Sequence, residues 1–269
     1  MRICALGDLL LDVIVRLAEP LAPGADARAQ TRLGAGGQAA NVAAWAVELG
    51  AQGRFVGKRG DDEAGELAAA ELERRGVEVA GPVATQRNGV VVSLVEPGGD
   101  RTMASDRGVA PTLHPDELDA SWFADCDWLH LTGYSLLASP IAEAAEAAAA
   151  LRQGRLSVDL SSWTAIRDLG AGRLRERLER LEPDLILGNE QEWSALGDGL
   201  APPVRVVKRG ARGFTVVTDE GEHEVEPLVG EVIDSTGAGD ALAAGFLVGG
   251  PELAREAAAR CVARLGAMP

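Results

Sequence analysis

The sequence predicts an α/β protein whose mainly parallel sheet is covered by helices on both faces. Short apolar runs of strand length alternate with alanine-rich helical stretches along most of the 269 residues. The runs in the body of the chain are apolar on both sides, which is typical of strands buried between two helical layers. The length suits a single α/β domain with an appendage, so we expect one domain over residues 1–269.

The individual elements follow from the same patterns. Strands are expected at Arg2–Leu6, Gly53–Val56, Trp128–Leu131, Leu156–Leu160, Leu185–Leu187 and Arg205–Val207. Helices are expected at Gly37–Leu49, Asp62–Arg75, Ile141–Arg152, Arg173–Leu181, Glu190–Leu196 and Ala241–Val248. In the second of these helices, Leu67 and Leu72 belong to the predicted apolar face and Gly76 is the predicted stop signal.

Two regions interrupt this alternation with strands that no helix separates. They are Leu11–Leu33 and Thr85–Met103. In the second region, Gly89–Val95 is a strand run, Pro97-Gly98-Gly99-Asp100 is a turn, and Arg101–Met103 begins the return strand. We expect these strands, drawn from about 11–33 and 85–103, to form a small β-sheet lid. The alternative is that they are extra edge strands of the main sheet.

Composition excludes several classes of protein. The formal net charge of −15 repels a phosphate backbone, so nucleic acid is not expected as a partner. Three scattered cysteines without a CxxC pair indicate buried thiols in a reducing compartment, and the three histidines lack metal spacing. Without a secretory pattern or an apolar run of about 20 residues, the chain is expected to be cytoplasmic, with no membrane partner.

The clearest motif lies near the C-terminus, where the end of an apolar strand is followed by Asp234-Ser235-Thr236-Gly237-Ala238-Gly239-Asp240 and a helix. Gly237, Ala238 and Gly239 leave backbone N–H groups uncovered at the helix start, which makes an anion hole. Asp240 stands beside that hole and is placed to take a proton from an attacking hydroxyl. A carboxylate at a helix N-terminus also has a purely structural explanation.

A second glycine-rich turn, Gly34-Ala35-Gly36-Gly37, opens the first helix, with Asn41 one turn in. The glycines allow a ligand to approach the backbone, and Asn41 offers a donor and an acceptor to a hydroxyl. Gly34-x-Gly36-x-x-Ala39 also mimics a dinucleotide fingerprint, so a dehydrogenase is a rival interpretation. It leaves the C-terminal anion hole unexplained.

Smaller signals lie at the ends of other strands. Asp8 and Asp12 bracket the end of the first strand, where α/β sheets place ligands and where turn aspartates are also common. Glu192, in Asn189-Glu190-Gln191-Glu192, is on a first helical turn and placed to hold Mg²⁺, although such glutamates also favour the helix dipole. Neither Lys58 nor Lys208 precedes Ser or Thr, so a P-loop is excluded.

The order of these motifs resembles the ribokinase-like, or PfkB, carbohydrate kinases over nearly the whole chain. The residues that carry the resemblance are Gly36-Gly37-x-x-x-Asn41, Phe55-Val56-Gly57-x-x-Gly60-Asp61-Asp62-x-x-Gly65, Asn189-x-x-Glu192, Val207-Lys208-Arg209-Gly210-x-x-Gly213 and Asp234–Asp240. The resemblance implies a three-layer α/β/α sandwich with a β-sheet lid that is often a dimer surface. It also implies an ATP-dependent kinase of a sugar or sugar-like alcohol that uses Mg²⁺.

The resemblance assigns roles position by position. It implies that Asp240 is the catalytic base and that Gly237, Ala238 and Gly239 form the anion hole. It implies sugar binding by Asp12, Gly36, Gly37 and Asn41, and nucleotide binding by Asn189, Lys208 and Gly210. It further implies that Glu192 binds Mg²⁺ and that Asp234 binds a monovalent cation such as K⁺. Three features depart from the family pattern. Gln38 stands where ribokinases have a lysine, and Asp159-Leu160-Ser161-Ser162 lacks the pattern of several sugar-acid and sugar-phosphate kinases. The segment after Gly245 is also short. These departures leave the substrate and the cation requirement open.

Two alternatives concern function rather than fold. A nucleoside kinase would use the lid to clamp a base, but Leu11–Leu33 and Thr85–Met103 contain no aromatic residue, which favours a sugar. A non-catalytic ligand sensor would not need both Asp240 and Glu192. Arg107 follows the predicted lid hairpin, and a lone arginine there meets either an acidic substrate or, more simply, the surface or a hinge.

Overall fold

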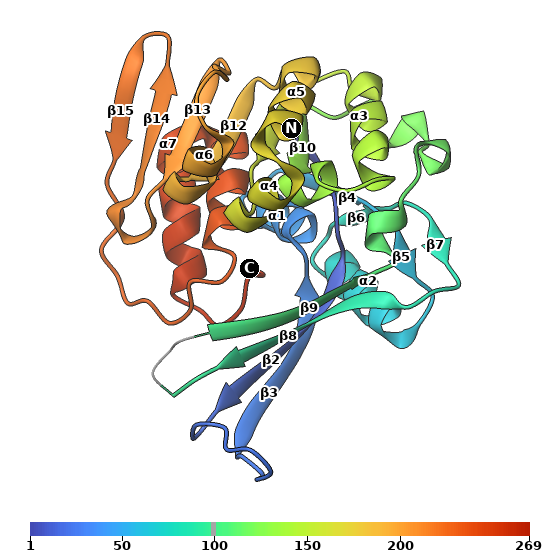
Figure 1. Cartoon of the computed structure of the whole chain (residues 1–269), viewed down its shortest axis with the longest axis vertical. Coiled ribbons are helices and arrows are strands. Elements are labelled where there is room, and N and C mark those ends of the chain that lie inside the picture. The colour runs from blue at the N-terminus through green and yellow to red at the C-terminus, as the bar shows by residue number, and fades with distance from the viewer. Residues whose placement is uncertain (98–100) are drawn as a thin grey trace.

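The computed structural model describes residues 1–97 and 101–269 and shows a large central sheet with a second, smaller sheet projecting from it (Figure 1). The central sheet has the strand order β15-β14-β13-β12-β11-β10-β1-β4-β6. The seven strands from β13 to β6 are mutually parallel, as the strand–helix alternation predicts. Their bounds are β1 (Arg2–Leu6), β4 (Gln52–Val56), β6 (Glu78–Ala80), β10 (Trp128–Thr132), β11 (Arg155–Asp159), β12 (Leu185–Asn189) and β13 (Val204–Lys208).

Helices cover both faces of this sheet and enclose a hydrophobic core on each side. On one face lie α1 (Gln38–Glu48), α2 (Glu63–Arg74) and α7 (Ala238–Val262), which is kinked at Gly249 and Gly250. On the other face lie α3 (Ile141–Leu151), α4 (Trp163–Leu169), α5 (Ala171–Leu181) and α6 (Glu190–Leu196). Short 3₁₀ helices lie at Ala110–Thr112, Pro115–Glu117, Ala120–Trp122, Gly133–Leu136 and Gly210–Arg212. The predicted three-layer α/β/α architecture is therefore confirmed.

Helix α2 shows how local sequence signals determine where a helix begins and ends. The Asp62 carboxylate caps it by accepting a hydrogen bond from the N–H of Gly65 at 3.1 Å, and Gly76 follows its end with φ of 82°. Leu72 is fully buried as predicted. The prediction for Leu67 was wrong, because its side chain is 53% exposed. The helix buries only a narrow stripe, which Ala68 and Leu72 occupy.

The smaller sheet is the predicted lid. Its order is β3-β2-β8-β9, from β2 (Leu10–Leu17), β3 (Ala29–Gly36), β8 (Asn88–Val95) and β9 (Arg101–Gly108). These strands pair with one another and not with the central sheet, so the edge-strand alternative is excluded. The strands run slightly beyond the predicted ranges, and Arg107 lies within β9 rather than after it. Residues 98–100 of the predicted turn lie outside the described residues.

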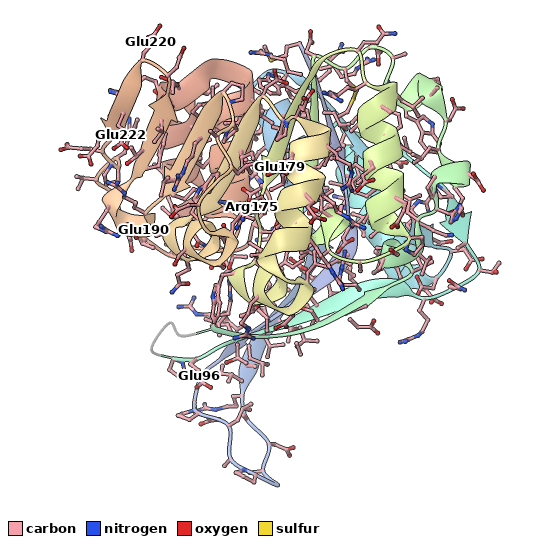
Figure 2. The ribbon with its side chains drawn as sticks, turned by 45° about the horizontal axis from the view of Figure 1, so that its top comes forward. Glu96, Arg175, Glu179, Glu190, Glu220 and Glu222 are labelled. Carbon is pink, nitrogen blue, oxygen red and sulfur yellow. A yellow bond between two sulfur atoms is a disulfide. The ribbon has the colours of Figure 1, made fainter. Side chains whose placement is uncertain are left out.

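One edge of the central sheet was not predicted. β14 (Phe214–Thr218) and β15 (Gly221–Val225) form an antiparallel hairpin beside β13, while β5 (Arg59–Gly60) and β7 (Val83–Ala84) pair separately. The outermost strand, β15, carries exposed charged side chains, and Glu220 and Glu222 project from this edge in Figure 2. Charges of this kind protect an open edge strand from pairing with another chain.

Two further observations concern the expectations from composition. Cys4 and Cys126 form a disulfide, whereas Cys261 is a buried free thiol. The expectation of unpaired cysteines was therefore wrong for that pair, whose sequence separation of 122 residues hid it. Among the helices formed by residues 1–97 and 101–269, none is both long and apolar enough to cross a membrane.

Candidate active site

The predicted site residues converge where the parallel strands end and α7 begins. Asn41 of α1 and Asp240 of α7 are 199 residues apart in sequence, yet the Asn41 Nδ2 donates to Asp240 Oδ2 at 2.7 Å. Helices α1 and α7 pack against each other, so the contact joins the two glycine-rich motifs in one place. The Asn41 Oδ1 is buried and has no hydrogen-bond partner in the described part of the chain, so it is free to accept a hydroxyl.

The start of α7 has the geometry of an anion hole. Gly237 adopts a φ of +75°, and a Cβ at this position would lie 2.5 Å from the Cβ of Ala267. Only glycine fits a turn that is both left-handed and this close to a neighbour. The N–H of Ala238 bonds to the Ser235 carbonyl at 3.3 Å. Within residues 1–97 and 101–269, the N–H groups of Gly237, Gly239 and Asp240 have no partner, which leaves them free to meet an anion.

Beside the anion hole lies a buried ion pair. The Lys208 Nζ is 2.6 Å from Asp159 Oδ2, with the aspartate fully buried. A Cβ on Gly239 would stand 3.4 Å from the same ammonium, so the positive charge lies next to the anion hole. Neighbouring carboxylates raise the pKa of Lys208 despite its burial, and the lysine stays charged. Lys208 was predicted as a site residue, whereas Asp159 was noted only as a departure from a sequence pattern.

Asp159 could have been found from its position. It is an acid at the carboxyl end of a buried parallel strand, which is where such sheets place their functional groups. The next loop contributes as well, because Ser161 Oγ donates to Gln38 Oε1 and accepts the N–H of Gly133 at 2.8 Å. Gln38 in turn bonds to the side chain of Asp240. The residue that replaces a lysine of ribokinases therefore supports the aspartate.

These surroundings change the acidity of Asp240. Burial raises the pKa of its carboxyl to about 7, and the negative charge of Asp159 adds to the increase. The hydrogen bonds from Asn41 and Gln38 and the charge of Lys208 act in the opposite direction. A carboxylate whose pKa is near neutrality is suited to accept a proton from a hydroxyl and to release it afterwards.

The other predicted substrate residues lie on the lid strands or directly after them. Asp12, on β2, points across β3, and its carboxyl group occupies the space that a Cβ on Gly36 would need. Gly37 approaches the carbonyl of Asp8, where a Cβ would lie 2.3 Å from the oxygen. Burial raises the pKa of Asp12 to about 6, although the nearby Arg101 lowers it. Asp12, Gly36 and Gly37 therefore lie close together between the lid and the start of α1.

Arg107 is partly buried and does not project freely from the surface. Its Nε and NH2 bond to the two carboxyl oxygens of Asp8 at 2.6 and 2.9 Å, and its guanidinium lies over the ring of Tyr134. Burial raises the pKa of Tyr134, and the nearby charges of Glu192 and Asp240 add to the increase. Tyr134 was not predicted, because nothing in its local sequence distinguishes it.

Asn189 and Glu192 form a capping box at the start of α6. The Asn189 N–H and Nδ2 donate to the Glu192 carboxylate at 2.7 and 2.8 Å, and Asn189 Oδ1 accepts the Glu192 N–H. Glu192 is only 3% exposed, and burial followed by the charge of Asp159 raises its pKa. The capping box therefore gives this carboxylate a structural role at the start of α6. Gly210, by contrast, lies in an open turn where an added Cβ would meet nothing within 4 Å.

The residues present fit Mg²⁺ that arrives with a nucleotide. Asp159, Glu192 and Asp240 bring three carboxyl groups near the single charge of Lys208, which leaves negative charge to balance. In the described ranges, no cluster of three His, Cys, Asp or Glu side chains has the geometry to hold a metal alone. Mg²⁺ usually keeps several waters and takes its other ligands from phosphates, which matches this arrangement.

The surroundings of Asp234 do not fit the predicted role of binding a monovalent cation. Its Oδ1 accepts hydrogen bonds from the N–H and hydroxyl of Thr236, and its Oδ2 accepts the N–H of Gly266 at 2.9 Å. The Arg101 guanidinium lies 3.7 Å from Oδ1 and balances its charge. N–H and hydroxyl donors and the Arg101 guanidinium already surround the Asp234 carboxylate, so it is not suited to bind K⁺.

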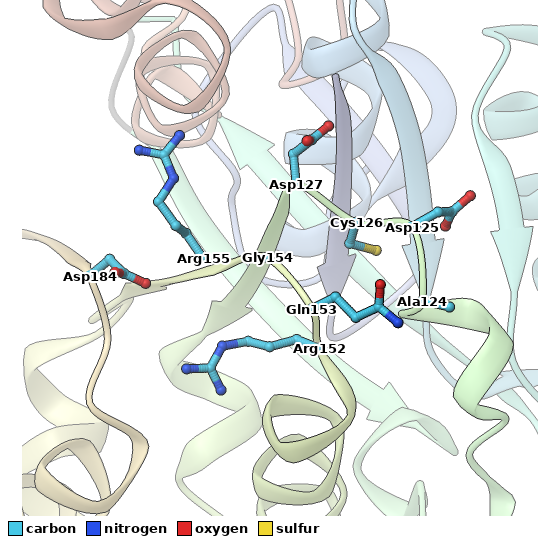
Figure 3. Close-up of a pocket in the computed structure, with 9 residues that line it drawn as sticks. All are labelled: Ala124, Asp125, Cys126, Asp127, Arg152, Gln153, Gly154, Arg155 and Asp184. Carbon is cyan, nitrogen blue, oxygen red and sulfur yellow. The ribbon is translucent and has the colours of Figure 1, made fainter.

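A hollow of about 610 Å³ lies at the opposite, amino ends of β10, β11 and β12 (Figure 3). The charged groups around it already have partners: Asp127 accepts the Arg2 N–H, Asp184 accepts the Leu156 N–H, and Arg155 stacks on Trp128. At the carboxyl ends of the strands, by contrast, polar side chains from distant parts of the chain meet, as Asn41 and Asp240 do.

Comparison with known proteins shows to which family the chain is related. The family model of the pfkB family carbohydrate kinases matches residues 1–268. The chain is 31% identical to the ATP-dependent ribose-1-phosphate kinase of Halopiger xanaduensis, over 91% of this chain and 83% of that protein. Its fold matches the adenosine kinase of Sinorhizobium meliloti (TM-score 0.85, 22% identity, 99% and 95% of the two chains). It also matches a putative E. coli ribokinase II solved with ATP and Mg²⁺ (TM-score 0.83, 21% identity, 99% and 94%).

The raised pKa of Asp240 predicts how stability changes with pH. The folded state holds this proton more tightly than the unfolded state, so the group's contribution to stability falls between about pH 4 and pH 7 and is constant above. Asp240→Asn removes this effect. The melting temperature of the variant, minus that of the wild type, should therefore increase from pH 4 to pH 7 and then level off. A difference that is independent of pH would show that the carboxyl has an ordinary pKa.

Proposed function

The chain belongs to the pfkB family of carbohydrate kinases, and on that premise we propose that Asp240 is the general base with which it phosphorylates a sugar hydroxyl. As a member it is an ATP-dependent phosphotransferase that acts on sugars or nucleosides. The observation that supports the role of Asp240 is its place beside the free N–H groups of the anion hole, 2.7 Å from an asparagine with an unpartnered oxygen.

The acceptor sugar binds between the lid and α1 in this proposal. Asp12 accepts hydrogen bonds from its hydroxyls, and Asn41 Oδ1 accepts another. The reacting hydroxyl then points at Asp240, which removes its proton as the oxygen attacks the γ-phosphorus of ATP. The new O–P bond forms while the bond to the β-phosphate oxygen breaks, and ADP leaves.

The anion hole and Lys208 stabilise the group in transfer. The N–H groups of Gly239 and Asp240 donate to its equatorial oxygens, and the Lys208 ammonium beside Gly239 adds a positive charge. Mg²⁺, when bound with ATP on this side, would supply positive charge that neutralises the charge developing on the phosphates. Asp159 and Glu192 face this side of the site, and Asn189 holds the Glu192 carboxylate in place. Gly210 lies in the open turn beyond Lys208 and is the place proposed for the nucleoside part of ATP.

We predict that Asp240→Asn lowers kcat by about 10²–10⁴-fold, because the side chain keeps its shape but no longer accepts the proton. The wild-type kcat/KM should lose activity on the acid side with an apparent pKa near 7. Steady-state phosphorylation assays across pH measure both quantities. Asp240→Asn should still bind a non-hydrolysable ATP analogue and melt cooperatively, which serves as the control.

Asp159→Asn provides a second arm of this experiment. The negative charge of Asp159 raises the pKa of Asp240. Removal of that charge should therefore shift the acid limb of the profile, the pH range in which kcat/KM falls on the acid side, to lower pH. A folded Asp240→Asn enzyme with nearly full activity, or an acid limb that Asp159→Asn does not move, would contradict the assignment of the base.

For the acceptor, we propose a sugar that carries a phosphate, with ribose 1-phosphate the first compound to test. The relative with 31% identity is named as a kinase of this compound. In this chain, Arg101 and Arg107 bring two guanidinium groups from β9 to the sugar side, near Asp12 and Asp8 respectively. The described residues of the lid strands include no aromatic side chain to stack on a base, which disfavours a nucleoside.

A thermal-shift screen with a non-hydrolysable ATP analogue tests this choice. Ribose 1-phosphate should raise the melting temperature more than ribose, fructose or adenosine does, because a ligand that binds only the folded state stabilises it. Asp12→Ala should abolish the shift by the sugar and retain the shift by the nucleotide. A larger shift with adenosine would favour the nucleoside kinase, and an equal shift with ribose would remove the role of the phosphate.

The outer face of the lid supports the proposal of a homodimer. Apolar side chains of three neighbouring strands lie together on this face, with the polar Thr31, Thr102 and Asp106 at its sides; the apolar ones are Val13, Val15, Leu33, Val90, Val92 and Leu94. Leu33 is 57% exposed and the valines are half-buried. A sheet face of this kind is self-complementary across a two-fold axis, so a second copy of the chain is the simplest partner.

We predict a dimer in solution that Val92→Glu converts to a monomer, because the substitution places a charge in the centre of the buried face. Light scattering coupled to size exclusion measures the mass. Val229→Glu, at a fully exposed valine outside the lid, is the matched control and should stay dimeric. A wild-type protein that is monomeric at all accessible concentrations would refute the dimer.

A further inference from the structure

The last residues of the chain lie directly under the anion hole. This segment, residues 265–268, is called here the C-terminal strap. Gly266 donates its N–H to Asp234 Oδ2 at 2.9 Å, at the start of the anion-hole turn. Ala267 is buried against Gly237, where a Cβ would lie 2.5 Å from its own Cβ. The position of the strap therefore decides where the anion-hole turn can lie.

Helix α1 holds the strap from below. Trp45 is fully buried, and its Nε1 donates to the carbonyl of Ala267 at 2.8 Å. Trp45 lies one turn beyond Asn41, which binds Asp240. The same helix thus positions the catalytic base through one residue and the floor of the anion hole through another.

The lid touches the strap from the other side. Arg32 of β3 donates from NH1 to the carbonyl of Leu265 at 3.1 Å. On β2, Ile14 Cδ1 lies 3.4 Å from the place of a Cβ on Gly266. Arg32 has no other partner in the described part of the chain and is exposed, so packing of the lid does not explain its position.

We propose that the C-terminal strap transmits the position of the lid to the anion hole, with Arg32 and Trp45 as positioning residues for phosphoryl transfer. A sugar held under the lid keeps Arg32 on the strap, the strap keeps Gly237 in place, and the N–H groups of the anion hole are then fixed to receive the γ-phosphate. Sugar and ATP should consequently bind with positive coupling, which is reciprocal by thermodynamic necessity. This inference rests on the proposed sugar kinase function.

The first experiment measures the affinity of a non-hydrolysable ATP analogue with and without ribose 1-phosphate by calorimetry, in the wild type and in Arg32→Ala. The wild type should bind the analogue about 5–150-fold more tightly when the sugar phosphate is present. Arg32→Ala should bind each ligand alone as the wild type does and lose most of this coupling, with a matching fall in kcat. Arg28→Ala is the matched control and should retain the coupling, because among the described residues the Arg28 side chain bonds to Glu19 and not to the strap.

Trp45→Phe is the second variant, and Trp128→Phe is its control because the Trp128 Nε1 has no partner among the described residues. Loss of the bond to Ala267 should reduce the coupling as Arg32→Ala does. The double variant Arg32→Ala/Trp45→Phe should be no worse than the more affected single variant, since both act through the strap. Additive losses would indicate two independent effects and would overturn the proposal.

Hydrogen exchange separates this proposal from the proposed function. In the ligand-free protein, the amides of residues 234–240 should exchange faster in Trp45→Phe than in Trp128→Phe. If no sugar binds but exchange rises in this way, the proposed substrate fails and the strap is supported. If ribose 1-phosphate binds with positive coupling that neither Arg32→Ala nor Trp45→Phe reduces, the strap does not transmit the position of the lid.

Discussion

The hydrogen bond between Asn41 and Asp240 joins two helices from opposite ends of the chain, and the geometry of the site depends on it. It requires α1 and α7 to pack together on one face of the sheet with their N-termini at the same edge. The glycines before each helix make this approach possible, because Gly37 and Gly237 have positive φ and no room for a side chain. A carboxylate with a pKa near neutrality results from this convergence.

Around this contact, charges are arranged in pairs that leave a small number of groups free. Lys208 is paired with Asp159, Arg107 with Asp8, and Arg101 lies near Asp234. A buried ion pair contributes little to stability, since desolvation offsets the attraction. We therefore interpret the ion pairs as preorganisation. They hold charged groups at fixed points around the space that the phosphates and the sugar would occupy.

Much of the fold was predictable from local patterns. The apolar strand runs, the capping aspartate of α2 and the two helix-free regions that form the lid all depend on residues near one another in sequence. The β14–β15 hairpin was missed because its outer strand is almost entirely polar, and the exposure of Leu67 was missed because a helical period does not tell how wide a stripe is buried. The disulfide joins positions 122 residues apart, which no local pattern reveals.

The sequence by itself determined which chemical groups are available: two glycine-rich helix starts, the first followed by Asn41 and the second by Asp240, and the NxxE pair. Only the tertiary structure decided which of them meet. It brought Asp159 to Lys208, Tyr134 under Arg107 and the C-terminal strap against Gly237, because strands distant in sequence end at the same edge of the sheet. It also placed N–H donors and the Arg101 guanidinium around the Asp234 carboxylate, which satisfies its hydrogen-bonding capacity and balances its charge. Residue type sets what a group can bind, whereas its distance to partners and its burial set whether it does.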